Sequence, residues 1–226
     1  MPAADCLKKN FVSLKDGTLC LARKHRILKR RSGRAAIDST GYESGHTSVY
    51  YSRRCGLKKS HYPKLTVVCD TENYLYLSAV PDIGPLPDDI EFKEAVVQAF
   101  HSQPFDELLA DAGYDSEANH AFIHGHLGAE SVIPPKHGRR PGKLPLTPYR
   151  LRMALEFPSE RYGQRWQLES CFSQDKRRFG SALRARSAKS QCRELYLRVL
   201  IHNLAIIRRL NLSFQHSRSD PNPGNW

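Results

Sequence analysis

Residues 162–176 read Tyr-Gly-Gln-Arg-Trp-Gln-Leu-Glu-Ser-Cys-Phe-Ser-Gln-Asp-Lys. A helix advances about 100° per residue, so a helix here would place four polar side chains within roughly 60° of one another. These four are Tyr162, Arg165, Glu169 and Lys176. An adjacent apolar stripe, able to dock the helix on a core, consists of Leu168, Phe172 and Phe179. The pattern predicts one carboxylate held between cations at the edge of a buried face. A solvated helix face with a chance charge pattern is the alternative.

Basic residues are clustered along the chain. The 226 residues carry a formal net charge of +12. Residues 1–34 hold ten Lys and Arg against two Asp, residues 134–152 hold six and no acid, and residues 161–193 hold nine against two acids. Such clusters favour a polyanionic partner, with nucleic acid as the first expectation and an anionic membrane surface as the second.

Membrane and export signals are not found in the sequence. No run approaches 18 apolar residues, so we expect no membrane span. The start, Met-Pro-Ala-Ala-Asp-Cys, lacks the apolar region of a signal peptide. The six cysteines include no Cys-x-x-Cys pair, which argues against a zinc ribbon or a redox motif. We therefore expect a cytoplasmic protein.

Two aspartates follow short strand-like runs. The segment 34–41, Arg-Ala-Ala-Ile-Asp-Ser-Thr-Gly, places Asp38 at the expected end of a first strand. Taken alone, Asp38 is better explained as a turn residue. The run 105–110 leads into Asp111, at the carboxyl end of an expected parallel strand, where open α/β sheets place their ligands. Asp115 is expected to cap the next helix.

The remaining pattern is that of an α/β domain. The other expected strands are 46–52, 64–70, 73–80 and 130–133, the second and third of them forming a hairpin. The other expected helices are 88–101 (capped by Asp88 or Asp89), 116–127, 151–157 and 187–210, and Gly180 is expected to end the helix that starts at 162. Residues 1–33 are expected to form a strand and turn or a flexible basic arm, and residues 211–226 a disordered polar tail. The proline-rich basic stretch 134–150 is either a loop that contacts phosphates or a linker.

Three histidines, His120, His124 and His126, share the helix expected at 116–127. Histidines four positions apart can share a zinc ion. No cysteine or further histidine completes such a site, so a polar helix face is the favoured explanation, with zinc as the alternative.

Asp38, Asp111 and Glu169 are three carboxylates with cations near them in the sequence. Such a set fits two divalent ions, and Mg²⁺ is favoured over Zn²⁺ because all of the ligands are hard oxygens. Two ions of this kind can activate a water or hydroxyl and stabilise a leaving 3′ oxygen in phosphodiester chemistry.

Three motifs in order resemble a known family. The spacing Tyr-x2-Arg-x3-Glu-x6-Lys is met at every position of the stretch 162–176. Asp-Ser-Thr-Gly at 38–41 and Ala-Asp-Ala-Gly-Tyr-Asp at 110–115 resemble the first and second Asp segments of the DDE transposases of bacterial insertion sequences. The resemblance covers about residues 34–210.

The resemblance implies an RNase H-like α/β fold, a mixed five-stranded sheet flanked by helices. It implies that Asp38, Asp111 and Glu169 are the catalytic triad and hold two Mg²⁺ ions, for which Mn²⁺ can substitute. The catalytic domain would span 34–210, preceded by a basic segment, 1–33, that could be a truncated DNA-binding region.

The resemblance also implies the partners. Arg165 and Lys176 would bind DNA phosphates near the cut end, and Tyr162 would lie beside the scissile strand. The substrates would be double-stranded DNA, both the element ends and the target. A homodimer in a synaptic complex is expected, associated with the nucleoid in a bacterial cytoplasm and with no membrane partner.

Three functions fit these observations. The first is a transposase that performs metal-dependent DNA cleavage, as an endonuclease, and then strand transfer. The second is an N-terminally truncated, transposition-incompetent DNA-binding remnant, because only residues 1–33 precede the first Asp segment. The third is an RNase H-like nuclease that hydrolyses DNA without joining it.

Overall fold

A five-stranded sheet forms the centre of the molecule. The computed structural model describes residues 2–44, 62–85, 87, 90–136 and 144–218. The strands are β1 (Ser32–Gly41), β3 (Tyr62–Asp70), β4 (Tyr76–Gly84), β5 (Phe105–Leu109) and β6 (Glu130–Val132), in the order β4-β3-β1-β5-β6. β1 pairs antiparallel with β3 and parallel with β5, so the sheet is mixed, as the sequence predicts. Two short strands, β2 (Glu43–Ser44) and β7 (Ala182–Leu183), pair separately.

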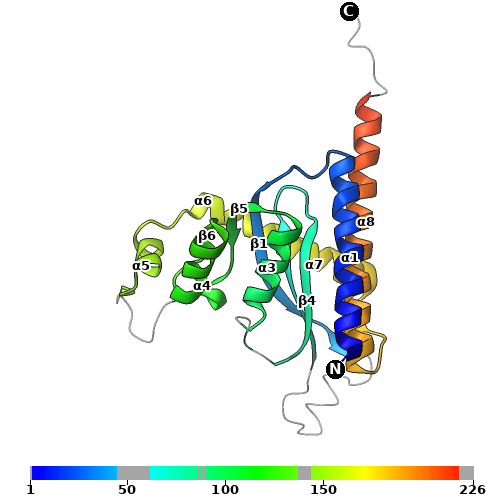
Figure 1. Cartoon of the computed structure of the whole chain (residues 1–226), viewed down its shortest axis with the longest axis horizontal. Helices are drawn as coiled ribbons and strands as arrows, with labels where there is room; N and C mark the ends of the chain where they lie inside the picture. Colours follow the sequence, from blue (N-terminus) through cyan, green and yellow to red (C-terminus); the bar gives the residue numbers. More distant parts are fainter. Residues whose placement is uncertain (1, 45–61, 86, 88–89, 137–143, 219–226) are drawn as a thin grey trace, which may run out of the picture.

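Helices cover both faces of the sheet and one of its edges (Figure 1). They are α1 (Pro2–Lys24), α3 (Phe92–Ser102), α4 (Glu117–Phe122), α5 (Pro148–Leu155), α6 (Ser159–Tyr162), α7 (Trp166–Phe179) and α8 (Ala188–Arg218). Three further turns are η1 (Ala112–Tyr114) and η3 (Gly163–Arg165), both 3-10, and η2 (Ile123–Leu127), a π-helix. In the described part of the chain, none of the helices combines the length and the apolar character that a bilayer crossing requires.

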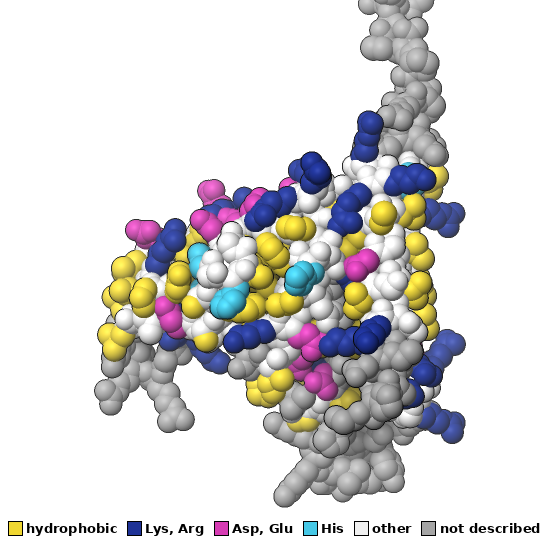
Figure 2. Space-filling view, viewed as in Figure 1, with side chains coloured by type: hydrophobic (Ala, Val, Ile, Leu, Met, Phe, Trp, Pro, Cys, Tyr) yellow, Lys and Arg dark blue, Asp and Glu magenta, His cyan; other side chains and the backbone are white. Residues whose placement is uncertain are grey.

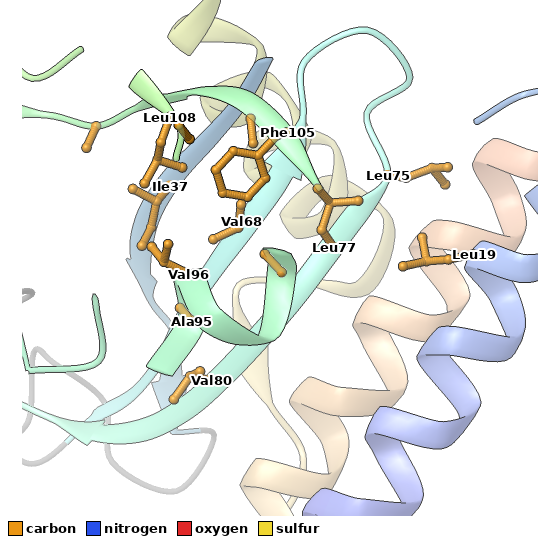
Figure 3. Close-up of a cluster of buried hydrophobic side chains, with 14 of the residues drawn as sticks. Leu19, Ile37, Val68, Leu75, Leu77, Val80, Ala95, Val96, Phe105 and Leu108 are labelled. Carbon is orange, nitrogen blue, oxygen red and sulfur yellow. The ribbon is translucent and has the colours of Figure 1, made fainter. Parts of the chain in front are cut away.

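Alternate residues of the strands point into two separate apolar clusters. The cluster on the α3 side includes Ile37, Val68, Val96 and Leu108 (Figure 3). The cluster on the α7 side includes Ala36, Val67, Leu109, Leu168 and Phe172. Because side chains alternate between the faces of a strand, a single register fills both layers. Fully burying each large apolar side chain contributes about 1.5–3 kcal/mol.

The hairpin expected between 64–70 and 73–80 is confirmed as β3 and β4, which pair antiparallel. The turn between them is longer than two residues because β4 begins only at Tyr76. The buried Asp70 stabilises it, since its Oδ1 accepts from the backbone N–H groups of Glu72 and Asn73 at 2.9 and 2.8 Å. The strand expected at 46–52 lies outside the described residues.

The N-terminal segment is the helix α1, so the expectation of a strand and turn or a flexible arm is wrong. α1 packs along α8, with Phe11 stacked on Tyr196 at 4.1 Å between ring centroids. Nδ2 of Asn203 lies 3.5 Å from Oγ1 of Thr18. In each of these two contacts the partners are 185 positions apart in the sequence, so the two helices run parallel (Figure 1). Lys15 is fully buried, and its Nζ donates to the backbone oxygen of Leu77 on β4 at 2.7 Å. A basic helix is thereby built into the core.

The long C-terminal helix predicted at 187–210 is confirmed as α8. It continues to Arg218, so the expectation of a disordered tail is wrong for residues 211–218. Residues 219–226 lie outside the described part. Asn203 of α8 binds β4 through its side chain: its Oδ1 accepts from Tyr76 N at 2.8 Å, and its Nδ2 donates to Tyr76 O at 3.0 Å. The amide therefore satisfies both backbone groups of Tyr76 at an edge strand.

Helix caps differ from the sequence-based expectation. Ser116, and not Asp115, caps α4, because its Oγ accepts from Asn119 N at 3.2 Å. The buried Asp115 carboxylate instead accepts from the Arg150 guanidinium, with Nη2 at 2.7 Å. For α3, the proposed capping residues 88 and 89 lie outside the described residues, and the helix begins at Phe92.

Candidate active site

Asp38 lies within β1, because that strand continues to Gly41. The expectation that the first strand ends at Asp38 is therefore wrong. Its partner in the antiparallel register with β3 is Val67. Ala36 belongs to the α7-side cluster, so Asp38, two residues further along the strand, points to the same face. The strand thus holds this carboxylate under α7.

Asp111 follows β5 and lies level with Asp38. β1 and β5 run parallel, with Ala36 paired to Leu109. Asp38 comes two residues after Ala36, and Asp111 comes two residues after Leu109. The two acids are therefore neighbours, since adjacent strands of a sheet are about 4.8 Å apart. The prediction that Asp111 follows the carboxyl end of a parallel strand is confirmed. Its Oδ1 accepts from Gly113 N at 2.7 Å, which orients the carboxylate.

Arg165 joins Asp38 to Glu169. Its Nη1 lies 3.2 Å from Oδ2 of Asp38, and its Nη2 donates to Oε1 of Glu169. The side chains of Arg165 and Asp38 are 18% and 19% exposed, whereas that of Glu169 is 55% exposed. Two of the three predicted acids therefore share one guanidinium, and the more exposed of them has room to change its conformation.

Burial raises the pKa of Asp38 to about 6, from an ordinary value of 3.8. The Ser39 N–H, 2.8 Å from Oδ1, and the Arg165 guanidinium oppose this rise in pKa. The negative charges of Asp111 and Glu169 add to it. Two carboxylates within electrostatic range of a third, with one guanidinium beside them, leave a surplus of negative charge that favours a cation.

The donor chemistry of this cluster fits a divalent metal ion. In the present conformation, the described residues contain no three Asp, Glu, His or Cys side chains close enough together to hold one. Asp38 and Glu169 do not meet at one metal position because the Arg165 guanidinium stands between them. Carboxylate oxygens are nonetheless the ligands that hard divalent ions take in proteins. In this conformation, the Arg165 guanidinium supplies the positive charge between these two acids.

Tyr162 meets the acids through Arg165. The Arg165 guanidinium lies 5.9 Å from the centroid of the Tyr162 ring. Burial raises the pKa of Tyr162, and Arg165 opposes that rise, so the phenol stays protonated near neutral pH. A single helix was expected from 162 onward, but Tyr162 ends α6 and the turn η3 separates it from α7. Gly163 begins this turn, and glycine weakens a continuous helix by about 1 kcal/mol.

Lys176 of α7 lies beside the acid cluster and contacts β1 beyond Asp38. Its Nζ donates to Oγ1 of Thr40 at 2.7 Å and lies 5.3 Å from the centroid of the Tyr42 ring. Burial lowers the pKa of Lys176. Thr40 is two residues beyond Asp38, or about 7 Å along a strand. Lys176 therefore places a cation next to the carboxylates without pairing with any of the three.

A basic segment continues from Lys176. Residues 176–193 hold seven Lys and Arg and no Asp or Glu. The six exposed cations are Arg177, Arg178, Arg184, Arg186, Lys189 and Arg193. β7 lies in this segment and pairs with β2, which directly follows the strand of Asp38. Glu194 fixes the loop, since its Oε2 accepts from the backbone N–H groups of Arg184 and Ala185 at 3.0 Å. Lys and Arg side chains also lie along the edge formed by α1 and α8 (Figure 2).

The histidines of α4 and η2 contact other elements. Nδ1 of His120 and Nε2 of His124 lie 2.6 and 3.0 Å from Oγ of Ser131 on β6. The His124 ring stacks on Tyr149 of α5 at 4.6 Å between centroids. These contacts join α4 and η2 to β6 and α5.

Two residues that support the acids, Tyr114 and Gly113, were not identified as such from the sequence. Oγ of Ser39 lies 2.7 Å from Thr66 Oγ1 and 2.9 Å from the Tyr114 hydroxyl, which fixes β1 next to Asp38 from the α3 side. Nothing in the sequence pattern indicates the Tyr114 contact. Gly113 is the second, because a Cβ there would lie 2.8 Å from Oδ1 of Asp111. The Asp-Ala-Gly turn is the one sequence signal that could have found it.

The mixed sheet, the helices on both of its faces and the carboxylates contributed by β1, the end of β5 and α7 define an RNase H-like domain. The sequence model of the family described as the transposase DDE domain matches residues 29–204, and the chain belongs to that family. Comparison with curated proteins gives no match. Membership indicates a transposase, an enzyme whose substrate is DNA and whose family generally uses divalent metal ions. Assignment to the branch with the Tyr-x2-Arg-x3-Glu-x6-Lys signature stays a prediction.

Proposed function

We propose that this domain cleaves DNA in a divalent-metal-dependent reaction and transfers the resulting 3′ end to a target, as the transposase of an insertion sequence. The observation that carries the proposal is that Asp38 and Glu169 share the Arg165 guanidinium, while Asp111 lies level with Asp38 on the neighbouring segment of the sheet. In cleavage, water attacks the phosphorus and the bond to the 3′ oxygen breaks, leaving a 3′ hydroxyl. In transfer, that hydroxyl attacks a phosphodiester of the target.

Asp38, Asp111 and Glu169 are the proposed ligands of two Mg²⁺ ions, for which Mn²⁺ can substitute. When bound, such ions activate the attacking oxygen and stabilise the leaving one. Asp38 is the fixed ligand, since the strand and the Ser39 N–H hold it. Glu169 has to leave Arg165 in order to bind a metal ion, and its 55% exposure supports such a movement.

The cations around the acids are the proposed DNA contacts. Arg165, once released by Glu169, can bind a phosphate bidentately. Tyr162 lies against this guanidinium and would contact the scissile strand. Lys176, which donates to Thr40 two residues beyond Asp38 on β1, would bind a neighbouring phosphate. The basic segment 177–193 would continue the contact with phosphates beyond it.

Plasmid nicking with Mg²⁺ or Mn²⁺ tests the catalytic assignment. The wild type should nick, whereas Asp111→Asn and Glu169→Gln should not, with DNA affinity nearly unchanged in both. Nicking that survives in either variant would show that the assigned acid is not a metal ligand. A wild type that binds DNA in a salt-sensitive way but never nicks would match the DNA-binding remnant.

Joining of an oligonucleotide 3′ end to a plasmid separates a transposase from a nuclease. A transposase yields joined products, whereas a nuclease yields hydrolysis alone. Light scattering with and without DNA tests the proposed homodimer, since a synaptic complex should double the protein mass.

The salt dependence of DNA binding tests the basic segment. Each phosphate contact contributes about 0.9 to the slope of log affinity against log salt. Arg184→Ala combined with Arg186→Ala should lower the slope by about 2. Lys29→Ala is the control, because Lys29 is exposed but pairs with Glu72 near the β3–β4 turn. An unchanged slope in the double variant would remove the segment from the DNA interface.

A further inference from the structure

A buried polar cluster fixes α7 to the sheet and to α8. Asp175 of α7 accepts from the Tyr76 hydroxyl of β4 through Oδ2 at 2.9 Å. Its Oδ1 lies 2.8 Å from Nδ1 of His202 on α8. Nε2 of His202 lies 2.8 Å from the backbone oxygen of Tyr74, and the His202 ring stacks on Tyr76 at 4.1 Å. Asp175, His202 and Tyr76 are 4%, 2% and 1% exposed, so none of them can meet DNA.

The contacts define the protonation of His202. A carbonyl oxygen only accepts, so Nε2 must carry a proton to bond to Tyr74 O. An ionised Asp175 likewise accepts from Nδ1, which makes the ring an imidazolium. Burial alone would lower the pKa of His202, but hydrogen bonds with Asp175 and Cys171 raise it to about 9. The pair is therefore a buried salt bridge between α7 and α8.

α7, which carries Glu169, is held on the sheet by such side-chain contacts. By contrast, Asp38 lies within a strand, and Asp111 comes two residues after a strand, and both strands are paired through their backbones. The buried apolar contacts of α7 come from Leu168, Cys171 and Phe172 and are not directional. A slip of one residue along the helix would turn it by about 100° and move it by about 1.5 Å. Buried polar pairs are best attested as devices that fix register in this way.

We propose that Tyr76, Asp175 and His202 are positioning residues that set the rotation and depth of α7, so that Glu169 stands next to Asp38. Asp175 lies six positions after Glu169 and directly before Lys176, so the same bridge also sets the cation at Thr40. The role in metal binding rests on the proposed function, whereas the role in fixing α7 does not.

The test compares two buried charge pairs on opposite faces of the sheet. Asp175→Asn and His202→Gln break the α7 pair, and Tyr76→Phe removes one hydroxyl as a milder change. Glu91→Gln is the matched control, since Glu91 and Lys64 form a pair 3% and 4% exposed on the α3 side, with Nζ 2.9 Å from Oε2. All variants are first compared by thermal unfolding, so that effects are judged at a similar loss of stability.

Hydrogen–deuterium exchange of residues 166–179 is the first measurement. Exchange should be at least about 10-fold faster in Asp175→Asn and His202→Gln and unchanged in Glu91→Gln. Mn²⁺ binding, followed by electron paramagnetic resonance without DNA, is the second. Loss of a group that orients a metal ligand typically weakens metal binding about 10–100-fold, and we expect that range for Asp175→Asn but not for the control.

Two results would overturn the inference. One is α7 exchange at the wild-type rate in both Asp175→Asn and His202→Gln. The other is an equal change in Glu91→Gln at an equal loss of stability, which would reduce the effect to general destabilisation. If the wild type neither binds Mn²⁺ nor nicks DNA, the proposed function fails, and the exchange of α7 still decides the positioning role.

Discussion

Replacing Asp38 by asparagine should stabilise the metal-free protein while abolishing cleavage. The folded state holds the Asp38 proton more tightly than the unfolded chain does, because the pKa of Asp38 is raised to about 6 from 3.8. The contribution of this group to stability is therefore highest below pH 3.8 and falls as the pH rises through 6. The carboxylate is only 19% exposed, so solvent screens this effect weakly.

The expected size follows from the pKa difference. About two pKa units at 1.36 kcal/mol each make the ionised Asp38 cost the folded state roughly 2–3 kcal/mol above pH 6. The asparagine amide carries no charge, and Arg165 keeps Glu169 as its partner. For a chain of this size, the gain corresponds to a rise of about 4–12 °C in the unfolding midpoint.

Thermal unfolding in EDTA at pH 4 and pH 7.5 is the assay. Asp38→Asn should unfold several degrees above the wild type at pH 7.5 and close to it at pH 4. Glu169→Gln is the control, because a carboxylate 55% exposed contributes little, and its midpoint should change by no more than about 2 °C. A gain of equal size at both pH values, or no gain at pH 7.5, would refute the electrostatic account of the site.

Three further outcomes are expected. Gly113→Ala should lower nicking at least about 10-fold with unchanged DNA affinity, because the new methyl would meet Oδ1 of Asp111 at 2.8 Å; equal nicking would show that the carboxylate orientation is unimportant. Wild-type stability should fall between about pH 6.5 and 9 as the raised pKa of His202 is passed, and His202→Gln should lack that part of the pH profile in thermal unfolding. Phe11→Ala should lower the free energy of unfolding by about 3–5 kcal/mol in urea titrations, whereas Leu14→Ala, at a residue 60% exposed, should change it by less than about 0.5 kcal/mol.

The sequence placed Asp38 next to a strand but did not predict the length of that strand. Ser39 and Thr40 favour turns, which is why the strand was expected to end at Asp38. In the fold, the Ser39 hydroxyl bonds to Thr66 and Tyr114, and Thr40 accepts from Lys176. These partners come from distant segments, so local preference was overruled by tertiary contacts.

The N-terminal helix was missed for a related reason. Its lysines read as a solvated basic arm, since lysine is almost never fully buried. Lys15 is fully buried because Leu77 O, Ser102 Oγ and Asp16 Oδ1 all accept from its ammonium. Such a set of acceptors arises only once the fold is complete, and no spacing rule reveals it.

The motif spacing predicted which cations accompany Glu169 but not how they are arranged. Arg165 bridges two acids, whereas Lys176 bonds to Thr40. The helical periodicity of residues 162–176 had predicted one continuous helix that carries both Arg165 and Lys176. The break at Gly163, which puts Tyr162 in α6 and Arg165 in η3, was not encoded in the period of the stripe.

The parallel pairing of α1 with α8 has a consequence for synthesis. Partners 185 positions apart are made about 10–40 s apart at ordinary translation rates. During that interval the apolar side of α1 lacks its neighbouring helix, and for the later part of it the backbone groups of Tyr76 lack Asn203, which is 127 positions away. An open strand edge is a site where another chain can pair. The yield of this domain in cells should therefore depend on chaperones that bind nascent chains more than on the equilibrium stability of the finished fold.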